Sequence, residues 1–186
     1  MSHRPAAFVF DNFLSDDKWQ YIVSHVNESS FLSTNTFDEW RDPFYEKVID
    51  WIDSRSREVD IWQDHWEQTI PLYSFINTCP IGFDREVAND GYHMDFGGYV
   101  YYIHPQWGDD WGGRLKLRDC EVDAIQPTPN RFVWINPGIW HGIEVTNSNA
   151  MNNRITIVGW PEGCVENATC DMIINTNTGN LSLIHI

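Results

Sequence analysis

The amino-acid sequence predicts an α+β fold, in which two helices are followed by a β-sandwich or barrel that they buttress on one face. Two N-terminal segments carry apolar residues at helical spacing, and from residue 69 onward β-branched and aromatic runs alternate with turn residues. The length of 186 residues suits one domain, and the 10 Trp, 10 Phe and 7 Tyr residues require a packed core. We therefore expect a single domain over residues 1–186, with a helical buttress at 1–68, a β core at 69–161 and a C-terminal tail at 162–186.

Both predicted helices show the signals of an element that packs on one side. The first follows a short apolar strand at residues 8–10 and begins after Ser15, a good N-cap residue that two aspartates follow. The second begins at Pro43, because proline suits the first helical position after an aspartate cap. The apolar faces of the two helices are formed by Trp19, Ile22, Val23 and Val26, and by Phe44, Val48, Trp51 and Ile52.

Short strands and turns make up the rest of the predicted fold. The expected strands lie at residues 70–77, 98–104, 114–117, 131–135, 141–146 and 154–160. Glycine pairs at 97–98 and 112–113, and the sequence Asn136-Pro137-Gly138, mark turns between them. Beyond Pro161 the pattern weakens, so residues 175–186 are expected to be a loosely held tail or a cloning remnant.

The charge of the chain excludes partners that need a broad basic surface. Its 27 acidic and 12 basic residues give a net charge of −15, which repels phosphate backbones and anionic lipid surfaces. We expect neither nucleic-acid nor membrane binding, although a small anion can still enter a local basic pocket.

The sequence also predicts a cellular compartment. Its start lacks the apolar core of a signal peptide, and no apolar run of about 18 residues occurs. A soluble cytoplasmic protein is therefore expected. In that reducing environment the four cysteines are expected to be free thiols: Cys79, Cys120, Cys164 and Cys170.

The tripeptide His93-Met94-Asp95 is the sharpest chemical feature of the sequence. In a strand, positions i and i+2 lie on the same face, so the imidazole and the carboxylate project together. His141 follows a predicted turn and starts another β run, from which it can complete a facial triad. Two histidines and one carboxylate on one face leave coordination positions open, as in non-haem iron(II) oxygenases. The alternative is a surface strand with unrelated polar residues.

Arg154 enters the last predicted core strand, where its alternation partners are Thr156, Val158 and Trp160. We expect this face to line the interior of the β domain, where an unpaired guanidinium is costly. A bound carboxylate would accept two hydrogen bonds from the guanidinium fork. A structural salt bridge to one of the many acidic residues is the alternative.

In their order along the chain, these motifs resemble the 2-oxoglutarate- and iron(II)-dependent oxygenases, particularly their prolyl 4-hydroxylase-like branch. The resemblance covers most of the chain, from the segment before the first helix to the strand at 154–160. Residues 100–103 with Trp107 are similar to a family strand that ends in a tryptophan, and residues 111–115 to a glycine pair before a leucine. Residues 132–141 are similar to the strand and turn that deliver the family's distal histidine.

The resemblance implies a mainly β fold, the double-stranded β-helix or jelly roll of cupin-like proteins, with iron(II) held by His93, Asp95 and His141. It implies a reaction that consumes 2-oxoglutarate and O2 and gives a hydroxylated product, succinate and carbon dioxide. The carboxylate at Asp95 favours hydroxylation, because related halogenases carry a small residue there.

The resemblance also implies a binding pocket for 2-oxoglutarate. The distal carboxylate of this cosubstrate would meet Arg154, with the phenol of Tyr102 as a second donor. Leu115 and Thr156 are further candidates for the same pocket. Tyr102 has the alternative of a purely structural role as a core aromatic.

The substrate is expected to be a prolyl or another peptide or amino-acid substrate, which is the family's usual chemistry. The polar insert at residues 79–90 departs from the family's short link before the His-x-Asp motif, and we expect it to be a mobile lid beside the iron. Arg85 in this insert and Trp107 are the expected substrate contacts. An ordered surface excursion is the alternative for the insert.

Two other functions are compatible with the same pattern. One is a cupin-like metalloenzyme that does not use 2-oxoglutarate, since a fold does not fix a function. The other is a non-catalytic jelly-roll module that binds sugars on Trp107, Trp111 and Trp140. Neither alternative explains an arginine placed one strand beyond the distal histidine, so the oxygenase hypothesis is preferred.

Overall fold

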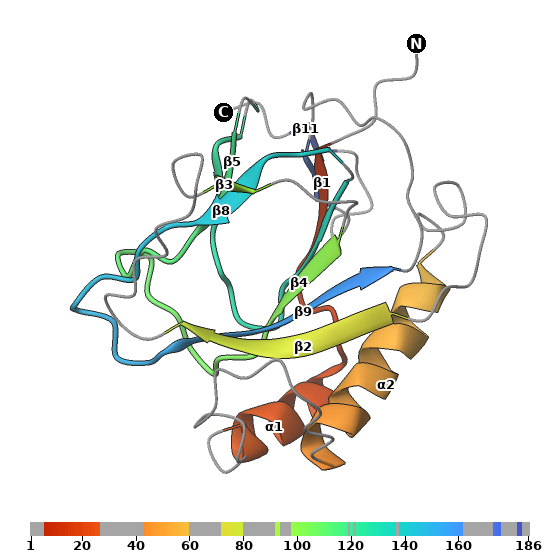
Figure 1. The fold of residues 1–186 in the computed structure, drawn as a ribbon. Helices are drawn as coiled ribbons and strands as arrows, with labels where there is room; N and C mark the ends of the chain where they lie inside the picture. Colours follow the sequence, from red (N-terminus) through yellow and green to blue (C-terminus); the bar gives the residue numbers. More distant parts are fainter. Residues whose placement is uncertain are drawn as a thin grey trace.

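Two β-sheets face each other in the computed structural model of the protein, and two helices cover the outer side of the larger sheet (Figure 1). The structure describes residues 6–26, 43–59, 72–79, 92–93, 98–118, 120, 122–136, 138–161, 173–175 and 182–183. Side chains are described for all of these except residues 72–79, 92–93, 160–161, 173–175 and 182–183. Mainly antiparallel sheets with two N-terminal helices agree with the predicted α+β class.

The helices are α1 (Asp16–His25) and α2 (Pro43–Glu58). The strands are β1 (Ala7–Phe10), β2 (Leu72–Cys79), β3 (Tyr92–His93), β4 (Gly98–Tyr102), β5 (Leu115–Leu117), β6 (Ala124–Ile125), β7 (Phe132–Ile135), β8 (His141–Ile143), β9 (Arg154–Pro161), β10 (Ile173–Asn175) and β11 (Ser182–Leu183). The large sheet has the strand order β11-β10-β1-β7-β4-β9-β2, and the small sheet has the order β3-β8-β5-β6. The strands predicted at 98–104 and 141–146 are present but end earlier, at the last residues of β4 and β8.

The two faces of the large sheet have different neighbours. Successive side chains of a strand point to opposite faces, and residues of β4 and β9 accordingly divide between two buried clusters. Tyr101, Ile155 and Ile157 belong to the outer cluster, which also contains the buried residues of the helices. Tyr102 belongs to the inner cluster, which contains residues of both sheets, and Val158 packs against it. The predicted alternation of β9 is therefore confirmed.

The helices begin where the sequence predicts, at the residue after Ser15 and at Pro43. Ser15 makes no side-chain capping hydrogen bond to α1, and its Oγ donates a hydrogen bond to Asp17 Oδ1 at 2.6 Å. Each fully buried aliphatic side chain contributes about 1.5–3 kcal/mol, so packing outweighs capping in holding the helices. Their residues in the outer cluster are Ile22, Val26, Phe44, Val48 and Ile52.

Asn130 ties the connection between β6 and β7 to two distant parts of the chain. Its backbone φ of +59° lies in the left-handed region, which asparagine tolerates better than most residues. Its Oδ1 accepts hydrogen bonds from the Leu14 backbone N–H at 3.1 Å and from the Tyr101 hydroxyl at 2.8 Å. Its Nδ2 donates to the Leu14 carbonyl at 2.9 Å, and its backbone N–H donates to the Tyr102 carbonyl at 3.1 Å. This buried amide therefore fixes the end of β4.

Two expectations from the sequence are wrong. The described residues of the expected tail, Asn175 and residues 182–183, lie in strands, because β10 pairs in parallel with β1 and β11 pairs with β10, which extends the large sheet. Cys120 is disulfide-bonded and not a free thiol. Both errors have the same physical reason: strand pairing and disulfide pairing depend on which segments meet in the folded chain, and spacing in the sequence does not reveal this.

Neither of the helices that the structure describes has the length and apolar character of a membrane-spanning segment.

Candidate active site

The small sheet brings the two predicted histidine ligands together in the backbone. β8 lies between β3 and β5, and His93 of β3 stands directly opposite His141 of β8. Opposed positions of an antiparallel pair share one face of the sheet. On the other side of β8, Leu117 stands opposite His141. The His93 side chain and the whole of Asp95 lie outside what the structure describes, so the described part of the predicted triad is the His93 backbone and all of His141.

A tight turn before β8 sets the orientation of His141. Gly138 has a φ of +83°, a conformation that suits glycine, and Trp134 Nε1 donates to Asn136 Oδ1 at 3.0 Å. His141 is buried, and its Nδ1 lies 2.9 Å from the carbonyl oxygen of Ile139. Because a carbonyl only accepts, Nδ1 donates, so in the neutral ring the lone pair is on Nε2. A metal-binding imidazole commonly has this arrangement, with its other ring nitrogen held by a carbonyl.

Arg154 is a buried cation, with 1% of its surface exposed. Its Nε donates to the Gly113 carbonyl at 2.8 Å and its Nη2 donates to the Tyr102 hydroxyl at 3.4 Å. The guanidinium carbon lies 5.1 Å from the centre of the Tyr102 ring. Within the described residues no carboxylate pairs with Arg154, and its Nη1 has no hydrogen-bond partner. A buried guanidinium without a counter-charge is costly, so this side chain retains the capacity to bind an anion.

Two other arginines of the β core, unlike Arg154, have a carboxylate partner within the protein. Arg114 makes a two-pronged contact with Glu144, with Nε–Oε2 and Nη2–Oε1 distances of 2.8 and 2.7 Å, which lowers the pKa of that carboxyl. Arg131 forms an ion pair with Asp11 and donates to a backbone carbonyl. Both are partly exposed and already hold a carboxylate of the protein.

The turn at Gly112 and Gly113 is shaped to hold the Arg154 side chain. Both glycines have positive φ, +69° and +70°. A Cβ on Gly113 would lie 2.9 Å from the Trp107 ring and 3.3 Å from Arg154 Cδ, and a Cβ on Gly112 would lie 2.4 Å from the Val145 carbonyl oxygen. The absence of side chains therefore lets the Gly113 carbonyl reach the guanidinium.

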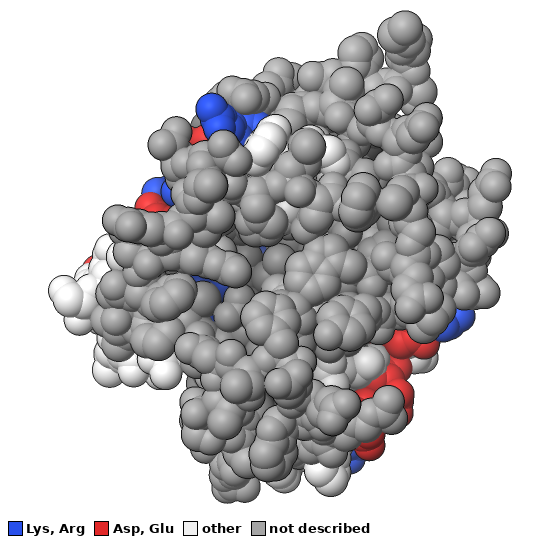
Figure 2. All heavy atoms as spheres, in the orientation of Figure 1, with Lys and Arg blue, Asp and Glu red and all other residues white. Residues whose placement is uncertain are grey.

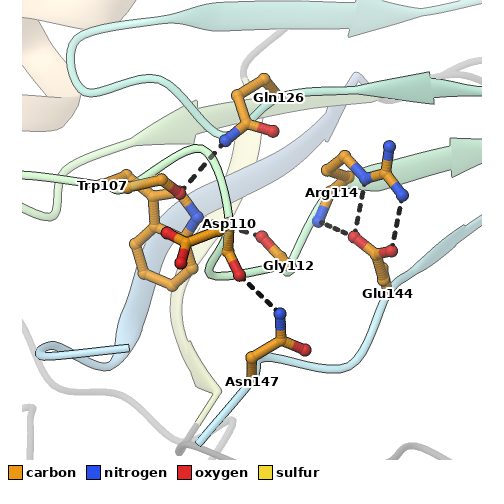
Figure 3. A network of polar contacts seen from close by, with 8 residues as sticks. Trp107, Asp110, Gly112, Arg114, Gln126, Glu144 and Asn147 are labelled. Atoms are coloured by element: carbon orange, nitrogen blue, oxygen red, sulfur yellow. Dashed lines mark hydrogen bonds and ion pairs between the residues drawn. The ribbon is translucent and has the colours of Figure 1, made fainter. Parts of the chain in front are cut away.

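An asparagine-rich segment before β9 fastens this turn (Figure 3). Asn147 Nδ2 donates to the Asp110 carbonyl at 2.6 Å, and Asn149 Nδ2 donates to the Asp110 carboxylate at 2.8 Å. Asn152 Nδ2 donates to the Gln106 carbonyl at 3.1 Å. Three amides thus hold the connection between β4 and β5 beside the start of β9, where Arg154 lies.

The remaining predicted pocket residues lie on neighbouring strands. Tyr102 of β4 stands directly opposite Thr156 of β9, and both are fully buried. Leu115 of β5 is buried in the same inner cluster as Tyr102. The predicted pocket residues therefore line the space between the two sheets or lie at its edge: Arg154, Tyr102, Thr156 and Leu115.

Several predicted features fall outside the described residues. Arg85, Asp95 and residues 80–90 of the predicted lid are among them, whereas Cys79 is the last residue of β2 and not part of a loop. Among the described side chains no group of three potential metal ligands occurs. Because two of the three predicted ligand side chains lie outside that part of the chain, this leaves the predicted triad untested.

The family match decides the class of the protein. Residues 84–162 match the family model of the 2OG-Fe(II) oxygenase superfamily, a segment that includes His93, Asp95, His141 and Arg154. The match covers 79 of the 186 residues, and by this segment the protein is a 2-oxoglutarate- and iron(II)-dependent oxygenase. Its cofactors are iron(II), 2-oxoglutarate and O2, as the sequence predicted. No curated protein matches this oxygenase in sequence.

Solved prolyl hydroxylases share the fold of this oxygenase. A Pseudomonas putida prolyl-4-hydroxylase is 15% identical with a TM-score of 0.60, and the alignment covers 86% of this chain and 88% of that one. A viral collagen prolyl hydroxylase from Paramecium bursaria Chlorella virus-1, solved as a 2-oxoglutarate complex, is 17% identical with a TM-score of 0.57 over 87% and 97% of the two chains. A Trichoplax adhaerens prolyl hydroxylase in complex with a peptide of hypoxia inducible factor is 17% identical with a TM-score of 0.57 over 84% and 83%.

Charge is unevenly distributed over the described surface of the oxygenase. Figure 2 shows acidic side chains gathered over α2, which carries Glu46, Asp50, Asp53 and Glu58. Lys and Arg atoms appear at the opposite edge of this view, with acidic atoms beside them.

Sequence reasoning missed the Gly113 carbonyl, which accepts from Arg154, and His104, whose ring centre lies 5.7 Å from that of Tyr102. A backbone carbonyl leaves no signal in the sequence beyond the glycine pair that exposes it. His104 lies two residues after Tyr102, so strand alternation continued past the end of β4 would have placed both on the same face.

Proposed function

We propose that the oxygenase hydroxylates a prolyl or other peptide or amino-acid substrate, with iron(II) held by His93, Asp95 and His141 and the distal carboxylate of 2-oxoglutarate held by Arg154. The observation that carries the proposal is the buried Arg154, which has no carboxylate partner among the described residues. A cupin-like metalloenzyme without 2-oxoglutarate has no use for such a cation.

His141 and Arg154, the described side chains of the proposed site, support binding of both groups. The ring of His141 has its Nδ1 proton on the Ile139 carbonyl, which orients Nε2 as a ligand atom. The register of β3 and β8 puts His93 beside His141, as two ligands of one metal require. When bound, iron(II) with 2-oxoglutarate and O2 supplies the oxidation that converts a substrate C–H bond into an alcohol and releases succinate and carbon dioxide.

The roles of the other pocket residues follow from their positions. Arg154 and the Tyr102 hydroxyl bind the distal carboxylate, which orients the keto-acid end of 2-oxoglutarate toward the metal. Leu115 and Thr156 line the pocket and exclude water from it, which strengthens the contact between the two charges. The proposed architecture is a double-stranded β-helix that the two helices buttress.

A peptide substrate is supported by the fold shared with prolyl hydroxylases, one of which was solved with a bound peptide. Arg85 and Trp107 remain the proposed substrate contacts. The ring of Trp107 packs beside Gly113, and its Nε1 donates to the Gly112 carbonyl at 3.0 Å, so in this proposal Trp107 offers its ring edge and not its N–H.

Anaerobic titration tests the proposal. Addition of 2-oxoglutarate to the iron(II)-loaded protein should produce the visible charge-transfer absorption of the chelate. Asp95→Ala and His141→Ala should each remove iron binding and turnover, whereas His25→Ala on α1 should retain both. Stoichiometric iron in the two ligand variants would remove the metal assignment. Iron binding with no absorption change on adding 2-oxoglutarate would favour the cupin-like metalloenzyme instead.

A further inference from the structure

His104 is a fully buried histidine that the proposed reaction does not use. Its Nε2 lies 2.7 Å from the Pro127 carbonyl oxygen, and its Nδ1 lies 3.3 Å from the backbone nitrogen of Ile155. The carbonyl only accepts and the amide N–H only donates. Nε2 therefore carries the proton and Nδ1 the lone pair, so both ring nitrogens of a neutral imidazole are satisfied.

The surroundings of His104 keep this ring neutral. Burial, together with the nearby positive charge of Arg154, lowers the pKa of His104 to about 3, against the opposing effect of its backbone hydrogen bonds. Among the described residues at this end of the proposed pocket, His104 therefore adds no positive charge to that of Arg154, and one guanidinium matches one carboxylate.

His104 touches the residues that support the Arg154 guanidinium. Its ring centre lies 5.7 Å from that of Tyr102, whose hydroxyl and ring both contact Arg154. It lies 4.5 Å from the ring centre of Trp107, which packs against the Gly113 that accepts from Arg154 Nε. Its bond to the Ile155 N–H holds the backbone of β9 at the residue directly after Arg154.

We propose that His104 is a positioning residue for 2-oxoglutarate, which fixes the direction in which Arg154 and Tyr102 present their donors to the distal carboxylate. This inference rests on the proposed function of Arg154. A purely structural histidine would affect the stability of the whole core and the binding of every ligand of the site. A positioning residue instead affects ligands that carry the distal carboxylate.

Two ligands separate these roles. The first is 2-oxoglutarate, and the second is 2-oxopentanoate, in which a methyl group replaces the distal carboxylate while the iron-binding end is unchanged. Their dissociation constants are measured anaerobically on the iron(II)-loaded protein from the charge-transfer absorption. The variants are His104→Phe, which keeps a ring but loses both hydrogen bonds, and His104→Gln, which keeps an amide donor for Pro127. His25→Gln on α1 is the control for loss of a histidine.

The expected result is a loss of 2-oxoglutarate affinity of about tenfold in His104→Phe and less in His104→Gln, because a misdirected charge-assisted contact loses part of the affinity that its complete removal would cost. The affinity for 2-oxopentanoate should stay within about twofold of the unsubstituted protein, and kcat at saturating 2-oxoglutarate should be retained. In an Arg154→Ala background, His104→Phe should have no further effect on 2-oxoglutarate, because the two residues act through one contact.

The outcomes are distinct. Unchanged 2-oxoglutarate affinity in either folded variant, or an equal loss for both keto acids, would overturn the positioning role. Arg154→Ala protein that binds 2-oxoglutarate normally would overturn the proposed function of Arg154, and the role of His104 with it. A third outcome is that Arg154→Ala loses the preference for 2-oxoglutarate over 2-oxopentanoate while the His104 variants keep it. This would leave the proposed function standing and remove only this inference.

Discussion

The two faces of the large sheet show how one strand serves both stability and chemistry. Along β9, Ile155 and Ile157 pack into the apolar cluster under the helices, whereas Arg154 and Thr156 face the space between the sheets. The outer face gains its stability from apolar burial and aromatic contacts. The inner face includes a buried cation, which lowers the stability of an empty site and is compensated when an anion binds. Substitutions on the two faces should therefore have separable effects.

The largest expected effect lies on the inner face. Arg154→Ala should weaken 2-oxoglutarate binding by 30-fold or more, since loss of a charge-assisted two-pronged contact costs about 2–5 kcal/mol. Iron binding should be retained, and Arg154→Lys should recover part of the affinity because it keeps the charge without the fork. Arg131→Ala is the matched control, because Arg131 already pairs with Asp11. Equal losses in Arg154→Ala and Arg131→Ala would show that general electrostatics, and not a specific contact, binds the cosubstrate.

On the outer face, Ile157→Ala should lower the free energy of unfolding by about 2–5 kcal/mol, because Ile157 is fully buried under the helices. The 2-oxoglutarate affinity of the folded fraction should not change. Urea unfolding together with keto-acid titration checks both statements, with Ile157→Val as a milder control that costs about 0.5–1.5 kcal/mol. A weakened cosubstrate affinity in the Ile157 variants would mean that the two faces are coupled.

The stability of the oxygenase should fall in acid through His104. The folded pKa of about 3 lies below the ordinary value of 6.5, so the unfolded chain takes up a proton that the folded chain excludes. This contribution to stability is complete above pH 6.5 and is lost as pH falls toward 3, at up to about 1.4 kcal/mol per pH unit. Urea unfolding between pH 7 and pH 4 should show a smaller pH slope in His104→Gln, while carboxylates titrate equally in both proteins. Equal slopes would contradict a neutral buried histidine.

The smallest expected effect is that of the Arg114–Glu144 pair, whose side chains are 48% and 29% exposed. Arg114→Gln should lower the free energy of unfolding by less than about 1 kcal/mol, and added salt should reduce the difference. Cosubstrate affinity should stay unchanged. A loss of 2-oxoglutarate binding in this variant would move the anion site from Arg154 toward the edge of the small sheet.

Local patterns predicted much of this molecule. The N-cap residue Ser15 and the proline Pro43 gave the starts of α1 and α2, and strict alternation placed Arg154 and Thr156 on the opposite face of β9 from Ile155. Motif order was enough to identify the resemblance to the oxygenases, because the motifs that carry it are short segments. These features are local, so the sequence records them directly.

What the sequence did not predict is non-local. Some hydrogen bonds join segments that are distant in the chain: Arg154 to the Gly113 carbonyl, Asn130 to Leu14, and His104 to Pro127 and Ile155. The pairing of β10 with β1 and the disulfide of Cys120 belong to the same group. A single sequence has no signal for such contacts, since each partner alone fits many surroundings.

The parallel pairing of β1 with β10 has a consequence for how the protein is made. Residues 7–9 lie beside residues 173–175, so this part of the sheet closes a loop of nearly the whole chain. Contacts of such sequence separation slow folding, because the entropy of closing the loop is lost before the contact forms. During synthesis, β1 emerges before either of its partner strands, and it can pair with β7 before β10 has been made. The edge of β1 that pairs with β10 therefore stays open for longer, and an open strand edge can pair with other chains.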